Sequence, residues 1–322
     1  MENQFPELFN GKTILYVHGF ASSGQSGTVR RLREAFPSAK VVAPDLPIHP
    51  AEALQLLRDT CESERPDLIL GTSMGGMYAE MLYGFDRILV NPALRIADTM
   101  QEHGLTGQQH FLNPRKDGVQ DFIVTKAMVK EYQAVTDQCF AHAADPGEQE
   151  RVFGLFADED QLVHTQPLFR QHYAQAIPFH GEHRMNDHAF LHSILPLMRW
   201  IDDRQEDRQR PVLAIALEAL RDGYGQPRSN AQKTIRQLLA TYDIHFVAPT
   251  ENASDTISWL TQYIGVPAWH HTVLTDQPRL LLADYFVTAQ PIDSLATTLV
   301  MPSDTFKSWE DLQVYFQRLG GQ

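Results

Sequence analysis

The sequence has few of the features of secreted, metal-binding or membrane proteins. It contains two cysteines, Cys61 and Cys139, among 322 residues. Two thiols allow neither a cysteine-based zinc site nor a disulfide framework, so we expect both to be reduced. No apolar run approaches the ~20 residues that cross a bilayer, and the polar start, MENQFPELFNGK, lacks the apolar segment of a signal peptide. These absences predict a soluble, cytoplasmic protein.

Positive charge is also scarce. The 27 Lys and Arg residues face 40 Asp and Glu residues, which gives a formal net charge of −13. The basic residues are scattered and form no polybasic patch. Because such an acidic surface repels phosphate backbones and anionic lipid, we expect no nucleic-acid partner and no membrane docking. The length, together with a 43% hydrophobic fraction, is sufficient for two domains with buried cores.

Short apolar runs alternate with amphipathic stretches in the first part of the chain. This alternation predicts an α/β domain with a parallel sheet covered by helices on both faces. Buried strands are expected at 13–18, 40–44, 67–70, 87–91, 151–157 and 175–179, and helices at 24–36, 51–62, 75–83 and 186–201. Residues 92–147 interrupt the pattern with a polar stretch that has helical pieces within 123–140, so we expect them to form a cap insertion.

The charged stretch DDRQEDRQR at 202–210 has the composition of a linker. We therefore predict a first domain at 1–208 and a second, smaller α/β domain at 209–322. In the second domain, strands are expected at 211–217, 245–248 and 280–287, and helices at 230–242, 256–263 and 309–319.

One serine lies in a sequence typical of catalytic nucleophiles. Gly71-Thr72-Ser73-Met74-Gly75 matches G-x-S-x-G and lies between a predicted strand and a predicted helix. In a nucleophile elbow, that context holds the serine in a strained turn with its hydroxyl above the sheet. A glycine-rich turn without catalytic function is the alternative. The strand–turn–helix context favours Ser73 as a nucleophile.

A serine nucleophile needs a histidine as general base and a carboxylate that orients the histidine. In this arrangement, the acid and then the histidine follow the serine along the chain. Asp160 follows the strand predicted at 151–157 and is our candidate acid, with Asp158 as the alternative. His183 lies in a loop after the next strand and is favoured over His180 as the base. His188 and His192 fall within a predicted helix and are expected to be surface or packing residues.

The oxyanion of a tetrahedral intermediate needs two preorganised N–H donors. The backbone amide of Met74, directly after Ser73, is the first candidate. The second is expected in the loop that follows the strand at 13–18, which reads HGFASSG. We assign the Phe20 amide there, with Ala21 as a neighbouring option; an ordinary turn at the strand exit is the alternative reading of this loop.

Four segments together resemble the small bacterial esterase family labelled YqiA/YcfP-like: YVHGFASSGQSGT, APDLP, GTSMGGMYA and VNPALR. The resemblance covers about residues 12–202. It implies an α/β-hydrolase fold and hydrolysis of carboxylic esters or thioesters. We expect a small-molecule substrate and no cofactor or metal. The insertion at 92–147 would then be a lid that shapes the acyl pocket.

The second domain resembles haloacid-dehalogenase-like phosphatases of the nucleotidase branch, through PVLAIALEAL, PRSNAQKTIRQLL, HFVAPT, LTDQPRLLLADYFV and SWEDLQVYF. That family works through an Asp-x-Asp pair beside Mg²⁺ at the end of its first strand, where this sequence has Ala216 and Glu218. Thr288 and Ala289 lie where that family has its later carboxylates, and Pro278 or Arg279 lies where it has a lysine, which puts the metal ligands and the phosphate clamp in doubt. The resemblance therefore implies an inactive relative that forms a homodimer, supports the lid or binds a ligand.

We expect a serine esterase or thioesterase, with two other functions kept as alternatives. One is a phosphatase or nucleotidase activity of the second domain, which would need a metal site such as Glu218 with Asp284. The other is a binding scaffold without catalysis. His270 and His271 have no partners at ligand spacing along the chain, so we assign them no metal, and the aromatic residues near Trp259 and Trp269 are expected to pack the second domain.

Overall fold

The computed structural model describes residues 7–319, which form two compact units, 1–186 and 187–322 by residue range. The predicted boundary near residue 208 lies beyond this division and stays a prediction. Residues 187–205 group with the second unit because their helices contact it; the Arg199 guanidinium, for example, donates to the Tyr242 carbonyl at 3.0 Å. Among the described residues, no helix has the length and apolar character of a membrane span.

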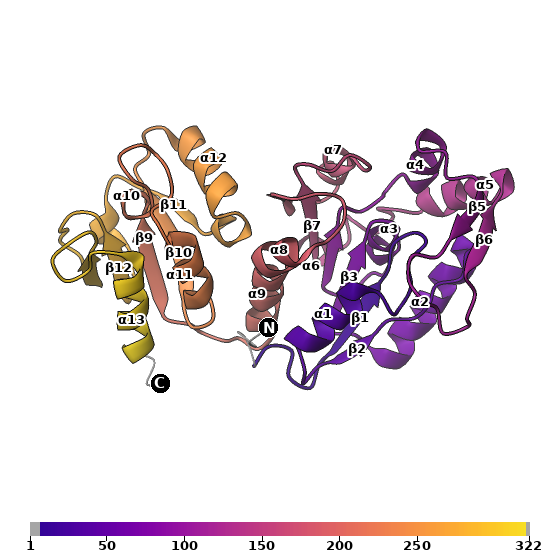
Figure 1. The fold of residues 1–322 in the computed structure, drawn as a ribbon, viewed down its shortest axis with the longest axis horizontal. Coiled ribbons are helices and arrows are strands. Elements are labelled where there is room, and N and C mark those ends of the chain that lie inside the picture. The colour runs from indigo at the N-terminus through magenta and orange to yellow at the C-terminus, as the bar shows by residue number, and fades with distance from the viewer. Residues whose placement is uncertain (1–6, 320–322) are drawn as a thin grey trace. The chain divides into compact units, whose positions relative to one another are not determined.

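The first unit is an α/β unit built on one parallel sheet (Figure 1). Its strands follow the order β2-β1-β3-β4-β7-β8, and every neighbouring pair is parallel. The strands are β1 (Thr13–Val17), β2 (Lys40–Val42), β3 (Leu68–Thr72), β4 (Arg87–Val90), β7 (Val152–Ala157) and β8 (Ala176–Phe179). The helices are α1 (Gly27–Ala35), α2 (Pro50–Glu64), α3 (Met74–Glu80), α4 (Ile96–Glu102), α5 (Lys126–Thr136), α6 (Glu148–Arg151) and α7 (Gln166–Phe169).

The predicted insertion at 92–147 adds no strand to this sheet. It contains α4, α5 and a separate antiparallel hairpin of β5 (Gly107–His110) and β6 (Asp121–Val124). The six strands themselves lie within three residues of their predicted positions at each end, and the sheet is the parallel one expected from the alternating pattern. Because parallel strands end at the same edge, the loops after β1, β3, β7 and β8 emerge together.

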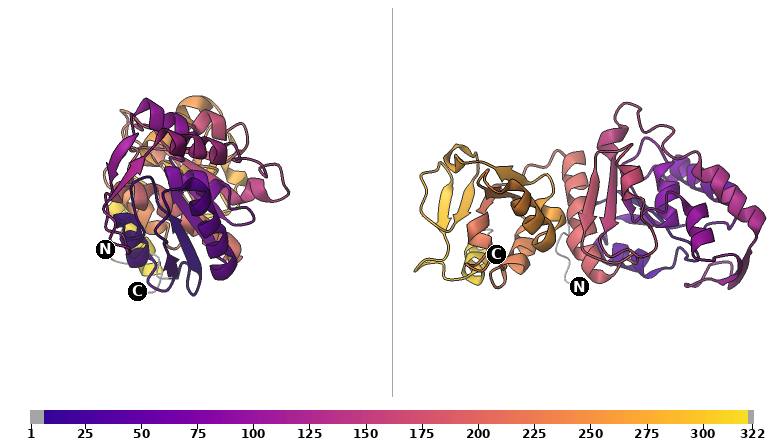
Figure 2. Two further views of the ribbon diagram at one scale, coloured as in Figure 1. Left: turned by 90° about the vertical axis from the view of Figure 1, so that its right-hand side faces the viewer. Right: turned by 90° about the horizontal axis from the view of Figure 1, so that it is seen from above.

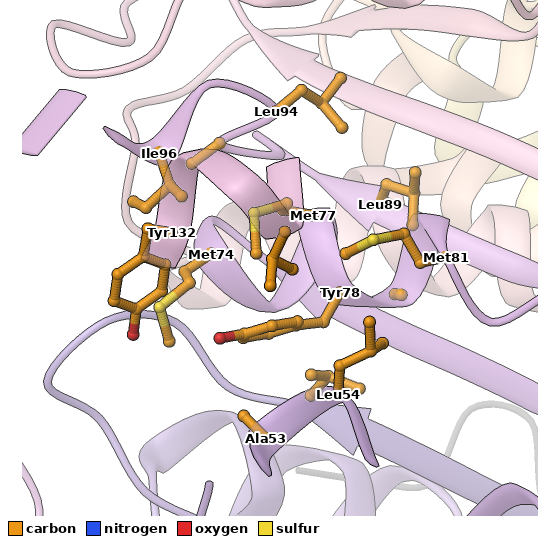
Figure 3. Packing of buried hydrophobic residues seen from close by; sticks show 14 of the residues in the cluster. Ala53, Leu54, Met74, Met77, Tyr78, Met81, Leu89, Leu94, Ile96 and Tyr132 are labelled. Atoms are coloured by element: carbon orange, nitrogen blue, oxygen red, sulfur yellow. The ribbon is translucent and has the colours of Figure 1, made fainter. Parts of the chain in front are cut away.

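Helix α3 fixes that edge to a large apolar core (Figure 3). It is short, and all of its side chains are buried. The core around it comes from α2, β4, α4 and α5, so the residues directly after Ser73 are held by packing on several elements. The labelled members of the cluster are Ala53, Leu54, Met74, Met77, Tyr78, Met81, Leu89, Leu94, Ile96 and Tyr132.

The second unit has its own five-stranded parallel sheet, and helices flank both sheets (Figure 2). Its order is β11-β10-β9-β12-β13, so the first strand of this unit lies in the centre. The strands are β9 (Val212–Ala216), β10 (Asp243–Ala248), β11 (Thr272–Leu274), β12 (Tyr285–Thr288) and β13 (Thr297–Val300). The helices are α8 (Asp187–Ala189), η1, a π-helix (Phe190–Ile194), α9 (Leu195–Gln205), α10 (Leu217–Leu220), α11 (Ala231–Leu238), α12 (Ala253–Tyr263), the 3-10 turns η2 (Val266–Ala268) and η3 (Pro278–Leu280), and α13 (Trp309–Leu319).

The close packing of α3 on the sheet leads to a stability prediction. A Cβ atom on Gly75 would clash with the backbone oxygens of Val17 and His18, whereas one on Gly27 would meet only the end of the Arg31 side chain. Gly75→Ala should therefore lower the free energy of unfolding of the first unit by about 1–3 kcal/mol, and Gly27→Ala should leave it nearly unchanged. Urea denaturation followed by circular dichroism measures both. Equal transition midpoints for the two variants would contradict the packing.

Candidate active site

Ser73 lies in a sharp turn between β3 and α3. Its backbone angles, φ 55° and ψ −120°, are strained for a residue with a side chain. Four hydrogen bonds stabilise this conformation. The Ser73 amide donates to the Val90 carbonyl at 2.9 Å, and the Ser73 carbonyl accepts from Gly76 and Ala93, each at 2.9 Å, and from Met77 at 3.3 Å. The turn has the strand–turn–helix form of a nucleophile elbow.

The imidazole of His183 lies between Ser73 and a buried carboxylate. Its Nε2 is 3.0 Å from Ser73 Oγ, and its Nδ1 is 2.7 Å from Asp160 Oδ2. The loops after β3, β7 and β8 supply these three side chains. Such a chain of hydrogen bonds can accept the proton of a hydroxyl as the hydroxyl oxygen forms a bond to carbon.

The environment of Asp160 favours its ionised form. Its side chain is 3% exposed, and its second oxygen, Oδ1, accepts hydrogen bonds from the amides of Leu162 at 2.8 Å and Val163 at 3.0 Å. Burial by itself would raise the pKa of this carboxyl. The hydrogen bond from His183 and the two amides outweigh burial and hold the pKa below its ordinary value. A buried, oriented carboxylate is what a histidine base requires.

The alternative residues lie apart from this arrangement. Asp158 pairs with His180, with 3.2 Å between the carboxylate oxygen and Nδ1, and both side chains are more than half exposed. Their contact joins the loop after β7 to the loop after β8. His188 and His192 lie in the helical segment that begins the second unit, where their rings stack with centroids 4.0 Å apart.

The HGFASSG loop lies directly against Ser73. A Cβ atom on Gly19 would be 3.3 Å from Ser73 Cβ and 3.9 Å from Ser73 Oγ, so a glycine permits this approach. Within the described part of the chain, the Phe20 amide, assigned from the sequence, makes no hydrogen bond; neither does the Met74 amide, which opens α3. Two free N–H groups beside a nucleophile are suitable donors to a developing oxyanion.

The buried His18 and the partly buried Asp45 hold this loop in place. His18 is 2% exposed; its Nδ1 contacts the Gly19 carbonyl at 2.9 Å, and its Nε2 accepts from the Leu46 amide at 3.0 Å. Because Nε2 accepts from an amide, it carries no proton and the ring is neutral. Burial lowers the pKa of His18, which favours the same form. Asp45 accepts from the Gly24 amide at 2.8 Å. The loop is therefore tied to the APDLP segment.

Sequence reasoning missed one residue of this site, Asn91. Its Nδ2 donates to the carbonyls of Glu182 at 3.2 Å and His183 at 3.1 Å, while its Oδ1 accepts from the Ala157 amide at 2.8 Å. One 2% exposed side chain thus joins the loops that carry the acid and the histidine. Its position directly after β4, at the same edge as Ser73, was the available signal.

The β5–β6 hairpin of the insertion contacts the loop beside Ser73. The Leu112 amide donates to the Ala21 carbonyl at 2.7 Å, and Ser23 Oγ donates to the Pro114 carbonyl at 2.6 Å. The rings of Phe20 and Phe122 pack edge to face with centroids 5.5 Å apart. A cavity of about 580 Å³ is lined by residues 110–115 and 118–121 of this hairpin.

In the second unit, Ala216 ends the central strand β9 and lines a cavity of about 240 Å³ with Glu218 and Thr288. Asp284 is at the opposite edge of the sheet, because it directly precedes β12. Its carboxylate accepts a hydrogen bond of 2.7 Å from the amide of Val212, the first residue of β9. The structure therefore does not bring Glu218 and Asp284 together as metal ligands. Among the described residues, three possible metal ligands cluster at one place, also in this unit: Asp243, His245 and His271.

Residues 13–146 match the model of an uncharacterised protein family, UPF0227. The match covers β1 to α5, with Ser73, the HGFASSG loop and the insertion. It ends before the loops that carry Asp160 and His183, and before the second unit. The haloacid-dehalogenase-like resemblance of the second unit thus has no support from this match.

Several solved structures are similar to the first part of the chain, at low identity. A monoacylglycerol lipase from Paleococcus ferrophilus is 15% identical, with a TM-score of 0.42, over 62% of this chain and 96% of its own. Est1E from Butyrivibrio proteoclasticus is 14% identical, with a TM-score of 0.41, over 62% and 89%. The thioesterase domain from the curacin biosynthetic pathway is 17% identical, with a TM-score of 0.38, over 61% and 92%. These values are too low to assign an activity.

The contacts of Asn91 predict a loss of Ser73 reactivity when they are removed. Asn91→Ala frees the loop that carries His183, and a displacement near 1 Å of a catalytic group costs about 100-fold in rate. We expect the fluorophosphonate labelling rate of Ser73 to fall by about this factor. Asn10→Ala removes an exposed asparagine of the same unit and should label at the wild-type rate. Equal rates for both variants would exclude a positioning role for Asn91.

Proposed function

We propose that the first unit is a serine hydrolase that cleaves carboxylic esters or thioesters of small molecules. The observation that carries the proposal is the hydrogen-bonded chain Ser73–His183–Asp160, with heavy-atom distances of 3.0 Å and 2.7 Å. The strained serine turn and the two free amides beside it support the same chemistry. The match to an uncharacterised family leaves the activity open.

The reaction proceeds in two halves. Ser73 Oγ attacks the carbonyl carbon while His183 Nε2 takes the hydroxyl proton, and the Met74 and Phe20 amides donate hydrogen bonds to the oxyanion. As the tetrahedral intermediate collapses, His183 returns the proton to the leaving alcohol or thiol, and an acyl group remains on Ser73. Water, deprotonated by His183, then releases the acid. Asp160 holds the Nδ1 side of the ring throughout and stabilises the imidazolium.

We also propose that the β5–β6 hairpin acts as the cap over the acyl group. Its hydrogen bonds to the loop beside Ser73 and the packing of Phe122 on Phe20 support this role. For the second unit, we propose a function other than phosphoryl transfer, because Ala216 at the end of the central strand has no nucleophilic atom. Its haloacid-dehalogenase-like ancestry and a homodimeric state stay predictions.

A panel of p-nitrophenyl esters of increasing acyl length tests the proposal on the full chain. Ser73→Ala should reduce hydrolysis to the background of the protein-free reaction for every ester, because the remaining residues offer no second nucleophile at this site. Full activity in Ser73→Ala would overturn the proposal. If the Ser73→Ala variant still hydrolyses p-nitrophenyl phosphate in the presence of Mg²⁺, a phosphatase activity of the second unit is favoured.

The identity of the triad acid has its own test. Asp160→Asn keeps the shape of the side chain but stabilises the wrong tautomer of His183, so kcat should fall by about 10⁴. Asp158→Asn is the matched control two residues away, and it should retain the wild-type kcat because its side chain pairs with His180 at an exposed position. Loss of activity in the Asp158 variant alone would exchange the two assignments.

A further inference from the structure

Strands β10 and β11 bring three metal-ligating side chains together in the second unit. Asp243 and His245 are two residues apart on β10, so both lie on the same face of the sheet. The parallel register pairs Phe246 with Thr272, which places His271, the residue directly before β11, beside His245. One ligand atom from each of the three lies within 4.8 Å of the others. We propose that Asp243, His245 and His271 bind one divalent transition-metal ion, with Zn²⁺ as the best fit.

The distances within the cluster match the span of a zinc ion. Asp243 Oδ2 is 3.0 Å from His245 Nε2, and Asp243 Oδ1 is 3.4 Å from His271 Nε2. Two ligands at about 2.1 Å from Zn²⁺ and at the tetrahedral angle lie about 3.4 Å apart. An ion between the three side chains therefore needs only small side-chain rotations. Two imidazoles and a carboxylate are ligands that zinc accepts, with water in the fourth position.

The hydrogen bonding of His271 favours a cation at this point. Its Nδ1 lies 2.9 Å from the Trp269 carbonyl oxygen, which can only accept, so Nδ1 carries a proton. In the neutral ring, Nε2 then has a free electron pair, and it faces a carboxylate oxygen of Asp243. Two electron-rich atoms in that position need a proton or a metal ion between them. Metal-bound histidines commonly donate their other ring N–H to a backbone carbonyl.

The surroundings fix the ligands and leave access for an ion. The indole of Trp200 in α9 stacks on the His271 ring, with centroids 4.3 Å apart and an interplanar angle of 8°. The Phe246 amide donates to the His271 carbonyl at 2.7 Å, which holds the backbone next to β10. The Asp243, His245 and His271 side chains are 34%, 30% and 18% exposed, so solvent reaches the cluster. His270 directly precedes His271 in the sequence, but its ring stacks on Trp269 and lies outside the cluster, so it can serve as a control.

Metal binding by the 322-residue chain tests this site. After treatment with a chelator and its removal, wild type should take up about one equivalent of Zn²⁺ in equilibrium dialysis. His245→Ala and His271→Ala should each bind at least about 100-fold more weakly, because loss of a ligand exceeds the 10–100-fold effect of an outer contact. Two controls, His270→Ala and His142→Ala, should bind as wild type. The latter removes an exposed His–Asp pair that has no third ligand among residues 7–319.

Co²⁺ provides a second readout that does not depend on activity or on the stability of the alanine variants. Wild type loaded with Co²⁺ should show the intense visible absorption of a four- or five-coordinate ion. Asp243→Asn, which preserves side-chain shape, should lose that band while its circular dichroism stays native. The proposal is overturned if wild type binds Zn²⁺ no more tightly than His271→Ala, or if the His270 and His142 controls lose binding equally.

Discussion

The strained turn at Ser73 is the constraint on which the first unit depends. A residue with a side chain at φ 55° and ψ −120° costs on the order of 1–3 kcal/mol. The buried side chains of α3, the backbone contact allowed by Gly75 and the hydrogen bonds from Ser73 to the Val90 carbonyl and from the Ala93 amide offset this cost. The same turn places Ser73 Oγ at the edge of the sheet where β7 and β8 end and the loops after them begin. It also leaves the Met74 amide free. Stability and reactivity therefore share one local structure.

Sequence reasoning found the parts of this site that follow from local pattern. Apolar runs bounded by polar loops predicted all six strands of the first sheet, and the chain order of serine, acid and histidine pointed to the loops that contain Asp160 and His183. The structure brings these side chains to hydrogen-bonding distance of each other. Their catalytic roles stay predictions. The sequence favoured Asp160 over Asp158 by its position in the loop, whereas the burial of Asp160 and the exposure of Asp158 come only from the fold.

The features that sequence reasoning missed depend on contacts between distant segments. Strands β11 and β13 are short, three and four residues, and too weakly apolar for a periodic signal, and the β5–β6 hairpin has mostly exposed side chains. Asn91 joins the end of β7 to the loop after β8, which lie about 65 and about 90 residues later in the chain. His271 has no ligand nearby in sequence, yet parallel pairing places it beside His245. In each case, the tertiary fold supplies partners that the local sequence does not indicate.

The most direct test of the account is whether Ser73 becomes covalently acylated during ester turnover. The 322-residue chain is mixed with p-nitrophenyl acetate, quenched in acid within the first turnovers, digested and analysed by mass spectrometry. His183→Ala serves as a control in which the nucleophile lacks its base. The account predicts one acetyl group on the wild-type peptide that contains Ser73, and far less acetylation of the control. Rapid p-nitrophenol release with no acetyl group on Ser73, or with the group on another residue, would contradict it.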